Sequence, residues 1–129
     1  MNVHRVRGVV AFHETDASGR YHYTNALKWV ENVEHALYRS VGVRAATFPR
    51  RAVAASFERS FVDGDEYEVE LEVEKVGNTS ITYVWRILKG EHVAVNGSHT
   101  VVHIDGSGRP TPLPDALRAV LDGLANDTA

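Results

Sequence analysis

The stretch that decides the fold is TNALKWVENVEHALYRSV, which spans residues 24–41. Its apolar residues recur at steps of three and four positions, the spacing that puts side chains on one face of an α-helix. They are Ala26, Trp29, Val30, Val33, Leu37 and Val41. Thr24 or Asn25 can cap the start of this helix, and Gly42 suits its C-terminal stop. The apolar face is wide enough to predict that the helix is buried.

The chain around this helix predicts antiparallel strands. Between Glu66 and Lys75, apolar residues alternate with glutamates, so one face of this strand is expected to be packed and the other solvated. Further strands are expected at residues 4–12, 53–62, 80–88 and 92–105, and a short helix at residues 114–124. One helix between one strand and four others predicts a single α+β domain over residues 1–129. The sheet would be five-stranded, antiparallel and wrapped around one long central helix.

Composition excludes several functional classes. The 129 residues contain no cysteine, which excludes disulfides, thiolate metal sites and a cysteine nucleophile. The net charge of −3 and the lack of a basic cluster are atypical of nucleic-acid-binding proteins. The longest stretch without a charged residue, residues 93–104, is shorter than the about 20 residues that cross a membrane. No secretory signal pattern is visible, so we expect a cytoplasmic protein without a membrane partner.

Several acidic and histidine side chains are expected to be structural. Glu31 and Glu34 fall on the polar side of the helix, where exposure to solvent is the favoured interpretation over a catalytic acid. His99 and His103 lie four residues apart on one strand, too far apart to share a metal, and indicate a mixed sheet surface. No G-x-S-x-G, H-E-x-x-H or P-loop motif occurs, and no metal site is expected.

The segment FHETDASGRYHYTN, residues 12–25, is the candidate functional site. It leads directly into the N-terminus of the helix, where unpaired backbone N–H groups and the positive end of the dipole can stabilise an oxyanion. Asp16 lies close enough to the expected cap at Thr24 to fold back beside this end. A carboxylate beside an oxyanion site suits acyl transfer. The alternative is that Asp16 only caps the loop.

The pattern E-T-D-A-S-G-x-x-x-Y-x-N resembles the active-site segment of hotdog-fold acyl-CoA thioesterases. The branch it resembles contains the 4-hydroxybenzoyl-CoA and the Tol-Pal-associated thioesterases. The likeness is carried by Glu14, Asp16, Gly19, Tyr23 and Asn25, and it continues in residues 27–31 and 76–80. The chain departs from the family pattern at Tyr21, His22 and Ala26, residues that line or border the acyl pocket in the family. These departures leave the mechanism in place and put the substrate in question.

The resemblance implies a thioester hydrolase in which Asp16 is the catalytic carboxylate, either as nucleophile or as general base for a water. Backbone N–H groups around Tyr23 would polarise the substrate carbonyl. Gly19 would let the loop approach the substrate, and Asn25 would fix the loop through hydrogen bonds. The reaction needs no cofactor. The predicted substrate-binding residues are Tyr21, His22, Trp29, Lys75 and Thr79.

The resemblance also implies the partners. The substrate would be an acyl-CoA or an acyl group on a carrier protein, and the protein would be a homodimer or homotetramer with each site at a subunit interface. Lys75, Arg86 and Lys89 are candidates for contacts with the phosphates of coenzyme A. Two other functions remain open: a hotdog module that binds acyl thioesters without cleaving them, and a hotdog dehydratase. His35 lies too far along the helix for the dehydratase, and Asp16 favours hydrolysis over binding alone.

Overall fold

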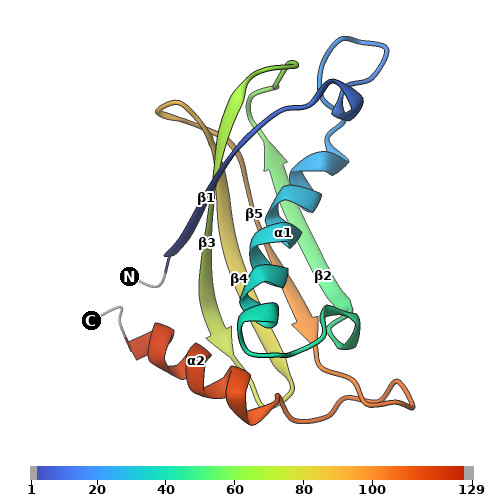
Figure 1. Cartoon of the computed structure of the whole chain (residues 1–129), viewed down its shortest axis with the longest axis vertical. Coiled ribbons are helices and arrows are strands. Elements are labelled where there is room, and N and C mark those ends of the chain that lie inside the picture. The colour runs from blue at the N-terminus through green and yellow to red at the C-terminus, as the bar shows by residue number, and fades with distance from the viewer. Residues whose placement is uncertain (1–2, 127–129) are drawn as a thin grey trace.

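The computed structural model describes residues 3–126, which form one antiparallel sheet with helices against it (Figure 1). The sheet order is β1-β3-β4-β5-β2, and every neighbouring pair is antiparallel. This arrangement confirms the α+β prediction and the five-stranded sheet. The strands are β1 (Val3–Val9), β2 (Arg50–Phe57), β3 (Glu66–Val76), β4 (Ser80–Lys89) and β5 (His92–Val102). The helices are α1 (Thr24–Ser40) and α2 (Asp115–Asn126), with short 3₁₀ turns η1 (Phe12–Glu14) and η2 (Ala45–Thr47).

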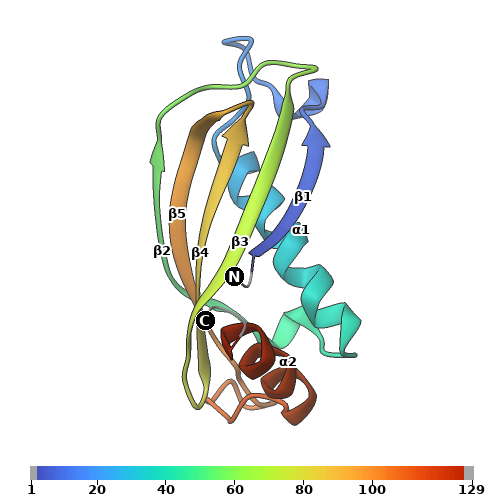
Figure 2. The ribbon, with the colours of Figure 1, turned by 90° about the vertical axis from the view of Figure 1, so that its left-hand side faces the viewer.

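Helix α1 lies on one side of the sheet, as the side view shows (Figure 2). It has 17 residues, and its predicted apolar face is buried from Ala26 to Leu37. Trp29 and Val30 are at most 3% exposed and pack against the inner side of the sheet. Burial of this face drives the packing of α1, because a lone helix of this length is marginal in water.

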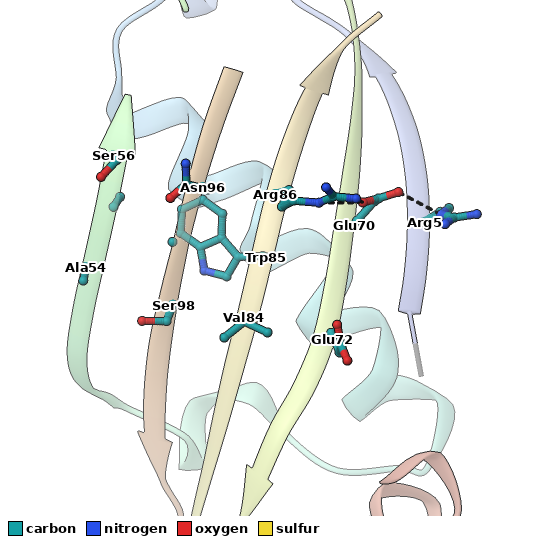
Figure 3. Close-up of a pocket in the computed structure, with 12 residues that line it drawn as sticks. Arg5, Ala54, Ser56, Glu70, Glu72, Val84, Trp85, Arg86, Asn96 and Ser98 are labelled. Atoms are coloured by element: carbon teal, nitrogen blue, oxygen red, sulfur yellow. Dashed lines mark hydrogen bonds and ion pairs between the residues drawn. The ribbon is translucent and has the colours of Figure 1, made fainter. Parts of the chain in front are cut away.

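The alternation in β3 is confirmed on its apolar side, where Val69, Leu71 and Val73 are buried. The expectation of a fully solvated glutamate face is wrong for Glu70, which is only 8% exposed. Arg5 on β1 donates to Glu70 Oε2 at 3.0 Å, and Arg86 on β4 donates from Nε to Oε1 at 3.0 Å. Figure 3 shows this triad crossing three strands on the outer face of the sheet. The two long arginine side chains cover the carboxylate.

The second strand begins and ends earlier than residues 53–62, the range expected from the sequence. The backbone N–H groups of Glu58 and Arg59 both donate to the carbonyl of Ala94, so the ladder to β5 ends there. The chain then turns inward, and Phe61 becomes fully buried. Phe61 is apolar because its side chain enters the core. It resembles a strand residue in the sequence, although it does not belong to a strand. The ends of the other predicted elements differ from the observed ones by at most three residues.

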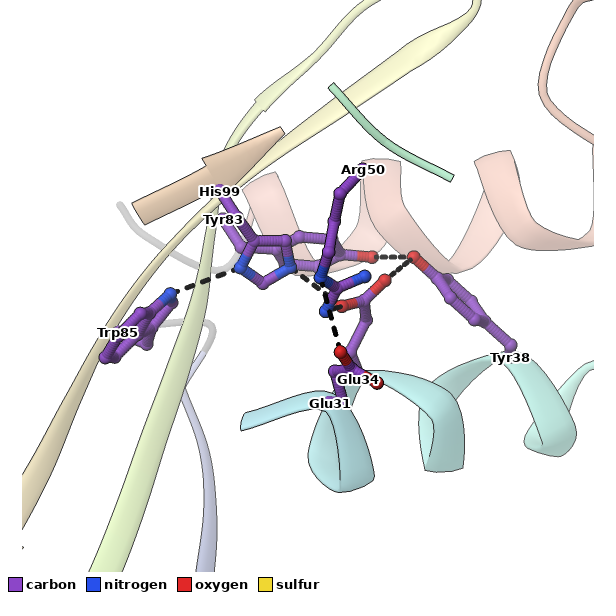
Figure 4. A network of polar contacts seen from close by, with 7 residues as sticks. All are labelled: Glu31, Glu34, Tyr38, Arg50, Tyr83, Trp85 and His99. Carbon is purple, nitrogen blue, oxygen red and sulfur yellow. Dashed lines mark hydrogen bonds and ion pairs between the residues drawn. The ribbon is translucent and has the colours of Figure 1, made fainter. Parts of the chain in front are cut away.

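Glu34 on α1 is fully buried, which contradicts its expected exposure on the polar side of the helix. Arg50 donates to its Oε1 at 2.7 Å, His99 contacts the same oxygen at 2.7 Å, and the hydroxyl of Tyr38 donates to Oε2 (Figure 4). Burial would raise the pKa of this carboxyl, but the hydrogen bonds from His99 and Tyr38 and the charge of Arg50 hold it below its usual value. Glu34 therefore joins α1 to β2 and β5 as an anion.

His99 belongs to this buried network and not to a mixed sheet surface, since it is only 3% exposed. The indole N–H of Trp85 donates to its Nδ1 at 3.2 Å. An indole nitrogen is only a donor, so Nδ1 must accept and the ring proton must lie on Nε2, facing Glu34. His99 is thus a neutral imidazole that donates to Glu34, and Arg50 provides the balancing positive charge.

We expect Glu34→Ala to lower the free energy of unfolding by about 3–5 kcal/mol. The variant leaves Arg50 and the two buried donors, His99 and Tyr38, without their shared acceptor. Glu31→Ala is the matched control. Its carboxylate is 3.7 Å from the Nε of the same Arg50 but its side chain is 38% exposed, so its loss should cost less than about 1 kcal/mol. Urea unfolding at one fixed protein concentration measures both. Equal costs for the two variants would contradict the account of the network.

Candidate functional site

Residues 14–22 form a small hairpin, here called the finger, between β1 and α1. The N–H of His22 donates to the carbonyl of Glu14 at 2.8 Å, and the N–H of Asp16 donates to the carbonyl of Arg20 at 2.9 Å. The turn at the tip closes when the N–H of Gly19 donates to the carbonyl of Asp16 at 3.0 Å. Gly19 has φ +82°, a left-handed conformation that favours glycine. The finger therefore carries Asp16 at its tip on an ordered backbone.

The carboxylate of Asp16 is exposed and ionised. Its Oδ1 accepts the hydroxyl of Ser18 at 2.6 Å and the N–H of Ser18 at 2.8 Å. These two hydrogen bonds hold the pKa of Asp16 below its usual value. Within residues 3–126, its other oxygen has no hydrogen-bond donor. A carboxylate oxygen at the finger tip is thus free to act as a nucleophile or a base.

The N-terminus of α1 follows the finger directly. Tyr23 occupies the N-cap position, so the prediction that Thr24 or Asn25 caps the helix is wrong. The side chain of Tyr23 makes no capping hydrogen bond. The N–H of Thr24 reaches Nδ1 of His22 at a long 3.3 Å. The N–H of Tyr23 donates to no acceptor in the described part of the chain. A free N–H at the positive end of a helix is suited to hold a developing oxyanion.

Asn25 ties the helix to the finger. Its Nδ2 donates to the carbonyl of Glu14 at 3.0 Å and to that of His22 at 3.1 Å. The side chain is only 8% exposed. It therefore joins both strands of the finger at the base, next to Tyr23.

An aromatic cluster lies beneath the finger. The ring of Trp29 stacks on Tyr67 at 4.0 Å and on Tyr21 at 5.5 Å between centroids, and Phe61 meets both Trp29 and Tyr21 edge-on. Of the predicted acyl-pocket residues, Tyr21 and Trp29 are buried in this cluster, whereas His22 is exposed. The hydroxyl of Tyr21 is buried without a hydrogen-bond partner among the described residues. The cluster gives the site an apolar floor with one unused polar group.

Three hollows border the finger, and two of them reach the start of α1. One of about 450 Å³ is lined by Asp16, His22 and Tyr23 together with Phe57 at the end of β2. The other, of about 650 Å³, is lined by His22, Asn25 and Trp29. His22 lies between the two, so the structure brings most of the predicted site residues around one surface at the start of α1.

Lys75 and Thr79 lie elsewhere. They flank the β3–β4 turn, which meets α2 through hydrogen bonds from Arg118 to the carbonyls of Gly77 and Asn78. This turn is at the opposite end of the sheet from the finger (Figure 1). A single chain therefore does not bring Lys75 or Thr79 to Asp16.

The other two candidate cations have partners within the chain. Arg86 pairs with Glu70 on the outer face of the sheet. Lys89 pairs with Asp65 at 3.1 Å and donates to the carbonyl of Ser60 at 3.0 Å. Within residues 3–126, no group of three histidine or acidic side chains could hold a metal ion. No helix in that range is long and apolar enough to cross a membrane.

Glu14 is part of the sequence motif, but the sequence does not predict its role. Its carboxylate accepts the N–H of Ala11 and the indole N–H of Trp29, each at 2.8 Å. The first bond joins residues three positions apart, as in a capping box, so a local sequence pattern could have predicted it. The second spans fifteen residues and has no local signature.

Comparisons with known proteins agree with this architecture. A predicted thioesterase from Bacillus stearothermophilus superposes with a TM-score of 0.85 at 22% identity, covering 94% of this chain and 95% of that one. A 1,4-dihydroxy-2-naphthoyl-CoA thioesterase from Synechocystis gives 0.85 at 15% identity, covering 95% and 98%. A gentisyl-coenzyme A thioesterase gives 0.79 at 19% identity, covering 92% and 99%. These likenesses confirm the hotdog-type fold.

Comparison with curated proteins gives no significant match. The family model of the thioesterase-like superfamily matches residues 10–121, a range that includes the whole finger, α1 and all strands except β1. Because this match covers most of the chain, the protein belongs to the thioesterase-like superfamily and is a thioesterase.

Proposed function

We propose that the protein hydrolyses an acyl thioester at the tip of the finger, with Asp16 as the reacting carboxylate. The observation that carries the proposal is that this ionised, exposed side chain and Tyr23, with its free N–H at the start of α1, line the same hollow. The substrate carbonyl oxygen would accept the free N–H of Tyr23, where the negative charge that develops is stabilised. The carbonyl carbon would then face Asp16.

Two routes use the same geometry. In one, an oxygen of Asp16 attacks the carbonyl carbon, the thiolate leaves, and water hydrolyses the resulting mixed anhydride to return the carboxylate. In the other, Asp16 removes a proton from a water that attacks the same carbon. The leaving thiolate needs little help in either route, since a thiol has a pKa of about 8.5. A general acid is therefore dispensable.

The aromatic residues around the finger favour an aromatic acyl group. Tyr21 and Trp29 form the apolar floor, and His22 stacks on Tyr23 at 4.9 Å between centroids beside it. Two of the structural neighbours are named for thioesters of aromatic acids. The donor would be coenzyme A, with an acyl carrier protein as the alternative.

We further propose a homodimer formed through the edge strand β2. Among the described residues, one edge of β2 pairs with no strand, and Val53 and Phe57 on β2 are 47% and 43% exposed. The other edge, β1, carries Arg5 and Arg7 in ion pairs, and charges of this kind protect an edge from pairing. Phe57 also meets the ring of Tyr23 at 5.5 Å, so β2 is continuous with the site.

The dimer would complete the site. Two identical strands that pair about a two-fold axis run antiparallel, so the far end of one sheet comes beside the finger of the other. This supports roles for the partner subunit's Lys75 and the partner subunit's Thr79, which cannot reach Asp16 within their own chain. A homotetramer would be a dimer of such dimers.

We expect Asp16→Asn to reduce thiol release from acyl-CoAs by about 100-fold or more, because the amide can neither attack nor accept a proton. Asp105→Asn is the matched control. Asp16 and Asp105 each begin a D-x-S-G-R turn in which the aspartate Oδ1 accepts the serine N–H at 2.8 Å and a glycine follows with φ near 80°. Only Asp16 lies beside α1, so the control variant should keep full activity.

The pH profile is part of the same prediction. The pKa of Asp16 lies below the usual 3.8, so the reacting anion is lost only as the pH falls through that lowered value. The kcat/KM of the wild type should therefore show no acid limb from this group above about pH 4. Activity that survives Asp16→Asn would refute the assignment. A wild type that binds acyl-CoAs without cleaving them would be a non-catalytic binding module. A wild type that cleaves only acyl-carrier thioesters would identify the carrier protein as the donor.

We expect Val53→Lys to dissociate the dimer, because it places a charge on the edge that must pair. Val6→Lys on β1 is the control, since Val6 is also 47% exposed on an edge strand. Sedimentation equilibrium distinguishes the two. Dissociation by Val6→Lys alone would assign the interface to β1 instead.

A further inference from the structure

The carboxylate of Glu14 connects three parts of the chain. Its Oε1 accepts the N–H of Ala11, where the chain leaves β1, and its Oε2 accepts the indole N–H of Trp29 in the second turn of α1. Both bonds are 2.8 Å long. Both oxygens are therefore committed to donors inside the protein.

The backbone of the same residue holds the base of the finger. The carbonyl of Glu14 accepts the N–H of His22 at 2.8 Å and the Nδ2 of Asn25 at 3.0 Å. Asp16 is two residues beyond Glu14, and Tyr23 is one residue beyond His22. The chain that leads from Asp16 to the start of α1 thus passes through His22, whose N–H is held by Glu14.

We propose that Glu14 is a positioning residue for hydrolysis, a role that rests on the proposed function of Asp16. Its carboxylate fixes the finger on α1, so that Asp16 and the N–H of Tyr23 face the same carbonyl group. Glu14 itself makes no bond to the reacting atoms. It acts through the backbone of the finger and through Trp29.

The geometry requires a carboxylate at this position. Two N–H donors converge on the side chain, and only a carboxylate presents an acceptor oxygen to each. A glutamine of the same size offers one oxygen and one NH₂ group, so one of the two donors would face another donor. The finger would then shift, and a displacement of about 1 Å in a reacting group can cost about 100-fold in rate.

We expect Glu14→Gln to lower kcat on the order of tenfold to a hundredfold while KM changes far less. Trp29→Phe removes the indole donor and keeps most of the ring, and it should reproduce part of this loss. The double variant should lose no more than Glu14→Gln alone, because both changes break one interaction. The matched control is Trp85→Phe, which removes a buried indole hydrogen bond of the same kind, to His99, without touching the finger. It should keep the wild-type kcat.

Amide hydrogen exchange tests the same proposal without catalysis. The N–H groups of Asp16 and His22 are bonded within the finger and should be protected in the wild type and in Trp85→Phe. They should exchange faster in Glu14→Gln or, if that variant does not fold, in Trp29→Phe. Unchanged kcat and unchanged protection would overturn the positioning role. A wild type that cleaves no thioester would overturn the proposed function instead, and exchange would still decide whether Glu14 holds the finger.

Discussion

The buried ring of Trp29 makes the contacts that fix the positions of helix α1, the sheet and the finger relative to one another. It stacks on Tyr67 of β3 at 4.0 Å, packs against Tyr21 of the finger, and donates its N–H to Glu14. Because stacking and hydrogen bonding use different parts of the ring, one side chain fixes both the depth of α1 on the sheet and the position of the finger. The start of α1 therefore has a defined place relative to Asp16.

The second attachment of α1 is polar. Glu34 holds Arg50 and His99, so the middle of the helix is joined to β2 and β5 by a charge that has no access to solvent. A buried carboxylate of this kind tolerates few alternative arrangements, because any shift leaves its donors unpaired. Two attachments, one aromatic and one ionic, prevent the helix from sliding or rotating on the sheet. The free N–H of Tyr23 is held in place by this rigidity.

Local sequence patterns predicted the helices and strands. Long-range contacts determine which charged side chains are buried, and local patterns do not predict these contacts. The periodicity of α1 and the apolar side of the alternation in β3 depend on neighbours in sequence, and both are confirmed. The burial of Glu34 and Glu70 depends on arginines 16 residues away and, for Arg5, 65 residues away, which no local window contains. The two D-x-S-G-R turns make the same point about the site. They share their backbone hydrogen bonds and the bond from the serine N–H to the aspartate Oδ1, whereas only Asp16 lies beside α1. From the sequence, only the resemblance to thioesterases distinguishes Asp16 from Asp105, and the catalytic role of Asp16 stays a proposal.

The proposed reaction places a thioester carbonyl between Asp16 and the N–H of Tyr23. The most direct measurement is a crystal structure with an unreactive acyl-CoA analogue in which a methylene group replaces the thioester sulfur and leaves the carbonyl in place. We expect a carbonyl oxygen about 2.7–3.1 Å from the N–H nitrogen of Tyr23. We also expect an oxygen of Asp16, or a water bound to it, about 3–3.5 Å from the carbonyl carbon. An analogue whose carbonyl lies away from the start of α1, for example in the hollow on the outer face of the sheet, would contradict the proposed reaction.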